Sequence, residues 1–267
     1  MAKEVWNKWH NIRKKTMTIE DVRRVFDYVE GNNMHDVMTD FVGIESLMKD
    51  IENSNLILLG ARPAMGKTAF ALSVAKYAAL GWGKPVVYFS LEMSEEQLRT
   101  RIKAMDWISD SGLIIDDTPA VMVDELREKC KRLKEEDSIG LIIIDYLQLI
   151  NEKGCDTRQA EMSSITQKLK KLACELSVPI IMVSQHPKCT ETRENHRPVL
   201  QDLRFYGAIE QDIDMVVFLY RDEYYNRHSE SKGIMEVIVA KQYGRNRRTI
   251  ELTYRRDGYE NKYIIPF

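Results

Sequence analysis

The chain has 267 residues, 44% of them hydrophobic, and its 39 Lys and Arg nearly balance 41 Asp and Glu, for a net charge of −2. This composition is ordinary for a soluble globular protein with one substantial core, and it provides no global electrostatic argument for binding nucleic acid or a membrane. The four cysteines form no C-x-x-C pair, and neither a signal peptide nor a membrane-spanning apolar run is present, so we expect a reducing, cytoplasmic location without membrane attachment.

The first part of the chain is polar and contains one amphipathic helical pattern, at residues 18–29. Thr18 and Asp21 form a capping pair, and Gly31 ends the pattern. The apolar stripe of this helix must be buried either against its own domain or against another subunit, and the sequence leaves both alternatives open. We expect residues 1–38 to form a separate segment and residues 39–267 to form the main domain.

Strand-like and helix-like segments then alternate. The expected strands are short apolar runs at residues 55–59, 85–89, 113–115, 141–144 and 179–183. The expected helices are at residues 68–80, from the Ser94/Gln97 capping box onward, 123–134 and 161–175. A long polar segment, 186–206, is followed by strands without long helices at 215–220, 234–240, 249–254 and 259–264. This pattern predicts an α/β fold: a mainly parallel sheet flanked by helices, with antiparallel C-terminal strands.

Residues 60–68 match the template G-x-x-x-x-G-K-[ST] between a predicted strand and a predicted helix. In this context the backbone N–H groups, the positive end of the helix dipole and the Lys67 ammonium favour a bound polyphosphate, and the Thr68 hydroxyl is suited to ligate Mg²⁺. The residues expected to contact a nucleotide here are Gly60, Ala64, Met65, Gly66, Lys67, Thr68 and Ala69. The sequence therefore predicts a P-loop.

Three polar residues follow other predicted strands. Asp145 ends an apolar run in the manner of a Walker B aspartate, which holds the water shell of Mg²⁺. Glu92 follows the strand at 85–89, where a carboxylate can polarise an attacking water; the alternative is a solvent-facing helix cap. Gln185 follows the strand at 179–183 and can hydrogen-bond a γ-phosphate.

The sequence does not favour a zinc site in the polar loop that contains residues 186–196. His186, Cys189 and His196 contain potential zinc ligands, but the set is incomplete and lies in a polar loop. We expect no zinc site there.

Together, these motifs resemble the ATPase domain of DnaB-type replicative DNA helicases, whose fold is RecA-like. The resemblance runs from about residue 39 to about residue 254, in ordered blocks at 60–72, 90–94, 115–119, 144–149, 183–185, 209–212 and 220–223. It does not include the family's separate N-terminal helical domain, which joins the ring's collar and meets primase. The segment 18–29 resembles the family's linker helix, which docks on the adjacent subunit.

The resemblance implies a homo-oligomeric ring, usually of six subunits, that binds ATP and Mg²⁺ at subunit interfaces and threads single-stranded DNA through its centre. A helicase loader or primase is a further implied partner. Lys67 and Thr68 would hold the phosphates and Mg²⁺, Asp145 the metal's waters, Glu92 would be the general base and Gln185 the γ-phosphate sensor. Arg101 matches an arginine that packs on adenine; its alternative is a solvated helix face.

DNA contacts in this family come from channel loops that match residues 152–161 and 202–207. Arg158, Arg204 and Gly207 are the implied phosphate contacts. Phe205 and Tyr206 stand where the family usually has an acidic and a small polar residue. These two rings would either stack on bases or pack under the loop.

The family completes the neighbour's ATP site with a lysine and, two residues later, an arginine. Lys241 is present, but the arginine position is Tyr243, and Arg245 is the nearest substitute. Arg245 is therefore either the arginine finger or part of the exposed face of a hairpin. A misplaced finger would leave nucleotide bound and turnover slow.

The sequence favours an ATP-hydrolysing helicase or translocase motor that acts on single-stranded DNA in replication. Two other hypotheses stay open. A RecA-like ATPase that remodels or regulates a protein partner would not need DNA for hydrolysis. A hydrolysis-poor subunit that modulates another helicase would bind ATP with little turnover.

Overall fold

The computed structural model describes residues 41–105, 112–185, 193, 195–244 and 246–253, all within the compact unit Asp40–Phe267. The N-terminal segment 1–38 with its expected helix, the expected strand at 259–264, His186, Cys189 and Arg245 lie outside the described residues.

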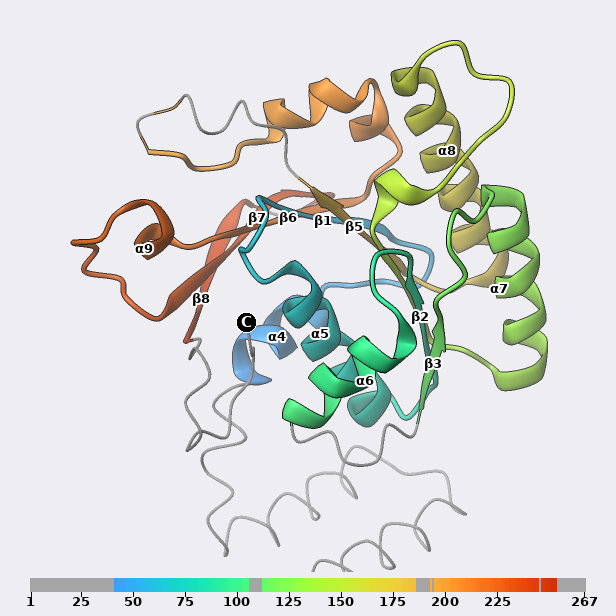
Figure 1. The fold of residues 1–267 in the computed structure, drawn as a ribbon, viewed down its shortest axis with the longest axis horizontal. Helices are drawn as coiled ribbons and strands as arrows, with labels where there is room; N and C mark the ends of the chain where they lie inside the picture. The colour runs from blue at the N-terminus through green and yellow to red at the C-terminus, as the bar shows by residue number, and fades with distance from the viewer. Residues whose placement is uncertain (1–40, 106–111, 186–192, 194, 245, 254–267) are drawn as a thin grey trace, which may run out of the picture. The chain divides into compact units, whose positions relative to one another are not determined.

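One eight-stranded sheet organises the described residues (Figure 1). Its strands are β1 (Leu56–Ala61), β2 (Val86–Ser90), β3 (Leu113–Asp116), β4 (Leu141–Asp145), β5 (Ile180–Gln185), β6 (Met215–Tyr220), β7 (Ile234–Gln242) and β8 (Arg248–Thr253). The order across the sheet is β3-β2-β4-β5-β1-β6-β7-β8. Neighbours from β3 to β6 are parallel, whereas β7 and β8 are antiparallel. The predicted α/β architecture is confirmed, except that the first of the C-terminal strands, 215–220, continues the parallel part of the sheet beside β1.

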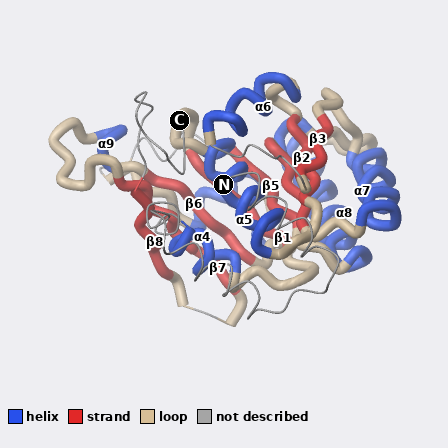
Figure 2. The backbone as a smooth tube through the Cα atoms, turned by 90° about the horizontal axis from the view of Figure 1, so that it is seen from below, coloured by secondary structure: helices blue, strands red, loops and turns tan. Residues whose placement is uncertain are grey.

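Helices cover both faces of the parallel part of the sheet (Figures 1 and 2). Helices α4 (Phe41–Met48), α5 (Lys67–Gly81) and α6 (Glu95–Ala104) pack on one face, and α7 (Val123–Asp137) and α8 (Arg158–Leu176) pack on the other. Every residue of β1, β2, β4 and β6 is buried. Strands covered on both faces need apolar side chains at every position, which explains their continuous apolar sequences.

The main differences from the predicted elements occur at helix ends and in short helices. Helix α8 begins at Arg158, before the predicted start, because the Thr157 side chain accepts a hydrogen bond from the Ala160 N–H, 3.1 Å away. Neither α4 nor the short helix α9 (Asp222–Tyr225) is among the predicted elements, and the polar segment contains a 3₁₀ helix, Leu200–Tyr206. These elements are too short to produce a clear periodic pattern.

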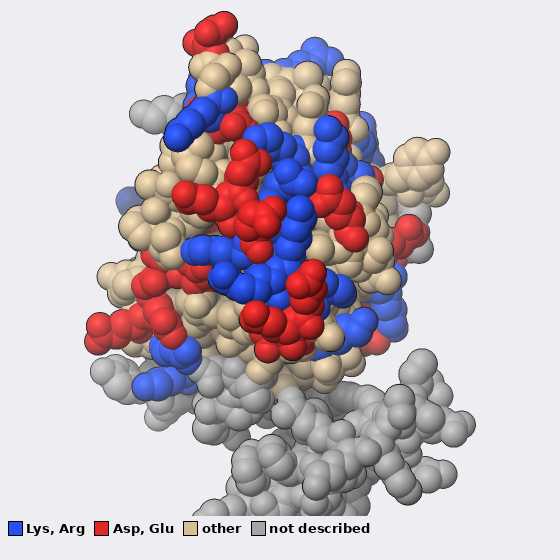
Figure 3. Space-filling model, turned by 90° about the vertical axis from the view of Figure 1, so that its right-hand side faces the viewer, with Lys and Arg blue, Asp and Glu red and all other residues tan. Residues whose placement is uncertain are grey.

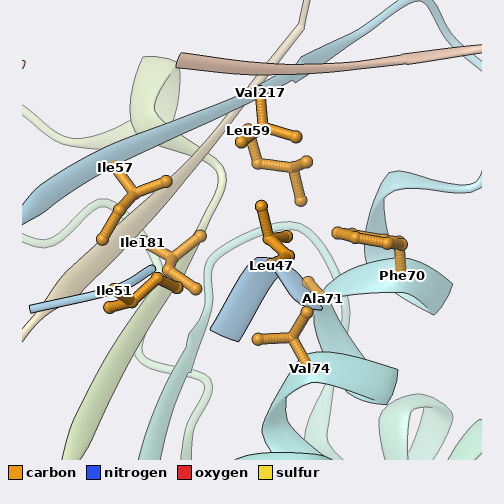
Figure 4. A pocket seen from close by; sticks show the side chains of 9 residues that line it. All are labelled: Leu47, Ile51, Ile57, Leu59, Phe70, Ala71, Val74, Ile181 and Val217. Atoms are coloured by element: carbon orange, nitrogen blue, oxygen red, sulfur yellow. The ribbon is translucent and has the colours of Figure 1, made fainter. Parts of the chain in front are cut away.

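A narrow pocket lies between α4, α5 and the sheet (Figure 4). Its lining is entirely apolar: Leu47, Ile51, Ile57, Leu59, Phe70, Ala71, Val74, Ile181 and Val217. Its volume of about 10 Å³ is at the lower limit for one water molecule, and the lining side chains provide no polar partner for a water. We interpret it as a gap in core packing and not as a ligand site.

Candidate nucleotide site

A glycine-containing loop joins β1 to α5. Gly66 is the N-cap residue of α5 and has a left-handed conformation with φ 87°, which glycine adopts without strain. Gly66 makes no side-chain cap, so the first backbone N–H groups of α5 have no such acceptor. These groups and the helix dipole make the start of α5 suited to an anion such as a phosphate.

Four parallel strands bring their carboxyl ends to the same edge of the sheet. Strand β1 leads into the P-loop, β4 ends at Asp145, β5 ends at Gln185, and Glu92 follows β2. The strand register pairs Ala61 with Gln185 and Ser90 with Asp145. The tertiary structure therefore gathers the polar residues of this edge around the P-loop.

Asp145 is the buried carboxylate of this edge, with only 4% of its surface exposed. Its Oδ2 atom accepts hydrogen bonds from the Thr68 hydroxyl, at 2.8 Å, and from the Tyr88 hydroxyl, at 2.7 Å. Its Oδ1 atom is buried and has no hydrogen-bond partner among the described residues. Burial raises the pKa of Asp145, and the hydrogen bonds from Tyr88 and Thr68 and the Lys67 charge offset only part of that rise.

This arrangement fits a magnesium ion. Magnesium keeps several waters and is usually bound by one or two protein groups together with substrate phosphates. The Thr68 hydroxyl lies at the start of α5, and the unpaired Oδ1 atom of Asp145 is an acceptor for a metal-bound water. The two residues named from the sequence as metal ligands are thus in direct contact.

Lys67 is the first residue of α5 and is half-buried. Burial lowers the pKa of its ammonium group, while the charges of Asp145 and Glu92 raise it and that of Arg62 lowers it. The Nζ atom donates one long hydrogen bond, 3.4 Å, to the Arg62 carbonyl. An ammonium group in this environment is suited to bind phosphate oxygens.

Glu92 is exposed and is not a helix cap, the alternative considered from the sequence. Ser94 caps α6 instead, because its side chain accepts from the Gln97 N–H while the Gln97 side chain accepts from the Ser94 N–H. The charge of Glu92 acts on Lys67 and on Tyr146. The carboxylate is therefore free of the capping role and close to the P-loop lysine.

Gln185 is connected to two other segments through its backbone. The Gln148 side chain accepts from the Gln185 N–H at 3.4 Å and donates to the Ser184 hydroxyl at 2.7 Å. The Tyr206 hydroxyl donates to the Gln185 carbonyl, and the Tyr206 ring packs against the core on the α7 and α8 face. Of the two alternatives for Tyr206, these contacts favour packing under the loop.

Arg101 lies on the exposed surface of α6. Its charge is one of those that oppose the effect of burial on Asp145 and Tyr88, so the guanidinium is near the nucleotide site. A contact with adenine stays a prediction.

The two expected DNA segments are adjacent in the fold. The 3₁₀ helix Leu200–Tyr206 contacts α8. Arg204 is exposed and has no ion pair within the described ranges, whereas Arg158 pairs with Glu161 at 2.5 Å and donates to the Gln148 carbonyl at 2.6 Å. Of these two cations, Arg204 is therefore the one without an ion pair to a described residue. The side chain of Phe205 lies outside the described residues.

Gly207 follows the 3₁₀ helix Leu200–Tyr206 and lies close to α8. We expect its replacement by alanine to destabilise the fold. Its φ is 92°, its ψ is −149°, and an added Cβ would lie 3.2 Å from both the Gln159 carbonyl oxygen and the Ser163 hydroxyl. We expect Gly207→Ala to lower the free energy of unfolding by about 1–3 kcal/mol in urea denaturation. Gly83→Ala is the matched control: φ is +62° there, but nothing lies within 4 Å of the added Cβ. Equal losses for the two variants would contradict the close approach.

The face formed by α7 and α8 is not a basic surface. Figure 3 shows Lys and Arg side chains interleaved with Asp and Glu on this side. Lys168 pairs with Asp124 and Glu152, and Arg127 pairs with Glu175. These pairs place acidic side chains beside the basic ones and so reduce the positive charge that this face offers to a phosphate backbone.

Lys241 is on β7, away from the P-loop of its own chain. Its Nζ atom donates to the carbonyls of Glu210 and Ile213, at 2.6 Å each. Lys241 pairs with Val216, which pairs with Leu58 of β1. Because β7 is antiparallel to β6, it ends at the edge of the sheet opposite to the P-loop.

Residues 243, 244, 246 and 247, which follow β7 and precede β8, lie at that opposite edge. The six residues of β1 separate the two edges by about 20 Å. These four residues are therefore remote from the P-loop of their own chain, and Tyr243 is 93% exposed.

Sequence reasoning missed two residues of the site. Tyr88 carries the only hydroxyl among residues 85–89 of an apolar strand, and Gln148 is three positions after Asp145. A polar group in a fully buried strand must find a hydrogen-bond partner, which was the available signal for Tyr88. Its partner was not predictable, because the order of the strands is a tertiary property.

The parallel sheet, the P-loop and the carboxylate on a neighbouring strand define a RecA-like P-loop nucleotide-binding fold. The chain belongs to the family of the DnaB-like helicase C-terminal domain, whose model matches residues 36–107 and 102–261. It is 41% identical over 256 residues, 85% of its length, to the replicative DNA helicase DnaB of Geobacillus stearothermophilus, and it covers 56% of that protein.

Two solved structures resemble the described fold. One is a separate ATPase domain, with a TM-score of 0.73 and 34% identity, over 90% of this chain and 96% of that one. The other is a DnaB-like replicative helicase studied with regard to its interactions with primase, with a TM-score of 0.71 and 30% identity, over 94% and 73% of the two chains. No helix in the described part of the chain is sufficiently long and apolar to cross a membrane.

Proposed function

We propose that this chain is the ATP-hydrolysing motor of a replicative DNA helicase and that it acts on single-stranded DNA as a homo-oligomeric ring of six subunits. The observation that carries the proposal is the contact of Thr68 with the buried Asp145 beside the P-loop, at the edge where Glu92 and Gln185 also lie. The membership of the DnaB-like family supports the choice of DNA as the substrate of the motor.

Each residue of the edge has a distinct proposed role. Lys67 and the N–H groups at the start of α5 bind the phosphates of ATP. Thr68 and Asp145 would hold Mg²⁺, which would supply positive charge to the phosphoryl group being transferred. Glu92 accepts a proton from the attacking water, and Gln185 hydrogen-bonds the γ-phosphate. Arg101 packs on adenine.

The proposed ATP site is completed by the adjacent subunit. The carboxyl end of β7, where Lys241 is the second-last residue, is at the edge of the sheet opposite to the P-loop. We propose that the adjacent subunit supplies Lys241 and Arg245 to the γ-phosphate, as a heterologous ring interface allows. A helicase loader or primase is a further proposed partner, because one structural relative was studied for its interactions with primase.

DNA is proposed to bind to the segments 152–161 and 202–207. Arg204 is exposed and without an ion pair among the described residues, and the backbone of Gly207 is adjacent to it. Arg158, Phe205 and Tyr206 complete the proposed surface. Tyr206 connects this surface to Gln185 through its hydroxyl, so DNA contact and γ-phosphate contact share one backbone connection.

The test is steady-state ATP hydrolysis with Mg²⁺, with and without single-stranded DNA, at two salt concentrations. We expect DNA to stimulate hydrolysis and salt to weaken the stimulation, because phosphate contacts release counterions. Arg204→Ala should raise the half-saturating DNA concentration about tenfold while basal hydrolysis is retained. Arg132→Ala, an exposed arginine on α7, is the matched control.

Other outcomes separate the alternatives. Hydrolysis that does not respond to DNA at either salt concentration would contradict the motor and favour an ATPase that remodels a protein partner. ATP binding without measurable hydrolysis would favour a subunit that modulates another helicase. An effect of Arg132→Ala equal to that of Arg204→Ala would reject the proposed DNA surface.

A further inference from the structure

Tyr88 is fully buried at the centre of β2 and belongs to the core on the α5 face. Its neighbours in the strand, Val87 and Phe89, point into the other core. A buried phenol hydroxyl costs free energy unless it forms a hydrogen bond. The Tyr88 hydroxyl donates to Oδ2 of Asp145 at 2.7 Å.

Burial raises the pKa of Tyr88 well above its ordinary value, and the nearby Asp145 charge raises it further. A carboxylate only accepts hydrogen bonds, so the Tyr88 hydroxyl is the donor in this contact.

The two oxygens of Asp145 are used unequally. Both hydroxyl donors, Thr68 and Tyr88, bind Oδ2, whereas Oδ1 is buried and unpaired among the described residues. The Thr68 hydroxyl is on the P-loop helix and is also expected to bind the cation. The Tyr88 ring is packed in the core, and its hydroxyl reaches the Asp145 carboxylate from the neighbouring strand β2. Tyr88 can therefore fix the orientation of the carboxylate without being a ligand of the metal.

We propose that Tyr88 is a positioning residue for the divalent cation: it fixes Oδ2 of Asp145 so that Oδ1 faces the water shell of the metal. This inference rests on the proposed function, because it needs a nucleotide–metal complex at the P-loop. Groups that orient a metal-binding side chain commonly change metal affinity or activity by 10–100-fold when they are removed. In this proposal Tyr88 acts on the metal only through Asp145 and contacts neither the metal nor the nucleotide.

The experiment measures binding and not turnover. A fluorescent ADP analogue is titrated into the full chain in EDTA, and Mg²⁺ is then titrated into the complex. Tyr88→Phe removes one hydroxyl and keeps the ring that fills the core. We expect the dissociation constant in EDTA to be unchanged and the half-saturating Mg²⁺ concentration to rise about tenfold.

Tyr220→Phe is the matched control. The Tyr220 hydroxyl also bonds an aspartate, Asp222 at 3.1 Å, and the Asn195 carbonyl at 3.0 Å, and within the described ranges it has no hydrogen bond to a P-loop residue. This variant is expected to keep the Mg²⁺ dependence of the wild type. Melting temperatures measured without nucleotide verify that both variants are folded.

An unchanged or lower half-saturating Mg²⁺ concentration in folded Tyr88→Phe would overturn the inference. Weaker binding already in EDTA would also overturn it, because it would mean a general disturbance of the P-loop. A wild-type chain that binds no nucleotide would reject the proposed function and the inference together. Normal Mg²⁺-dependent binding without DNA-stimulated hydrolysis would reject only the motor, so the two failures are distinguishable.

Discussion

Asp145→Asn is expected to lower ATP hydrolysis by about 10³-fold, because the metal that this carboxylate helps to hold contributes several kcal/mol to phosphoryl transfer. The same variant is expected to be more stable than the wild type in the absence of nucleotide and metal. Burial raises the pKa of Asp145, so the charged carboxylate opposes folding at neutral pH. Asparagine keeps an acceptor for the Thr68 and Tyr88 hydroxyls and carries no charge.

The pH dependence of this stability difference has a defined sign. A carboxyl group whose pKa is raised in the folded state stabilises the fold below its unfolded value, 3.8, and loses that contribution as the pH rises through its folded value. Asp145→Asn therefore gains stability relative to the wild type over that rise and keeps the gain at neutral pH. Thermal unfolding in EDTA, from about pH 2 to pH 8, measures the difference.

Asp116→Asn is a matched control for which we expect a change in stability of the opposite sign. Burial raises the pKa of Asp116, but hydrogen bonds from Lys129 and Thr118 and the Lys129 charge lower it overall. Its carboxylate lies 2.6 Å from the Lys129 ammonium. This variant should lose stability at neutral pH, and the loss should disappear as the pH falls below 3.8 through the folded pKa. An Asp145→Asn protein less stable than the wild type at neutral pH would contradict the cost that we assign to the buried charge.

Lys67→Ala and Arg245→Ala are each expected to lower hydrolysis by about 10³-fold or more, and a mixture of the two variants is expected to regain part of the activity. In a ring, one interface combines the P-loop of one subunit with the finger of the next. Random mixing in equal amounts restores both groups at up to about one quarter of the interfaces. Hydrolysis by each variant alone and by the preassembled mixture, at constant total protein, measures the rescue.

A second mixture tests whether the rescue requires an intact P-loop. Lys67→Ala mixed with the double variant Lys67→Ala, Arg245→Ala contains no intact P-loop, so it should stay inactive. Rescue in the first mixture and not in the second supports a shared site. If the first mixture never exceeds the activity of the separate variants, the assignment of Arg245 as the finger in trans is wrong.

Much of the candidate nucleotide site follows from short segments of sequence. The P-loop, the buried strands on either side of it and the residues Glu92, Asp145 and Gln185 after their strands are local patterns, readable from spacing and apolar runs. The helix cap at Ser94 was also correct, because a capping box involves residues only three positions apart. The DNA segments and the finger depended instead on a family resemblance and stay predictions.

The sequence by itself determined which residues form the strands, helices and phosphate loop, since those depend on neighbours within a turn or a strand. Only the tertiary structure decided that β5 lies between β4 and β1, that the Tyr88 hydroxyl reaches Asp145, 57 positions away, and that Lys241 is at the edge opposite to the P-loop. The physical reason is that the pairing of strands and the burial of their side chains depend on the packing of the whole core, which no local pattern encodes.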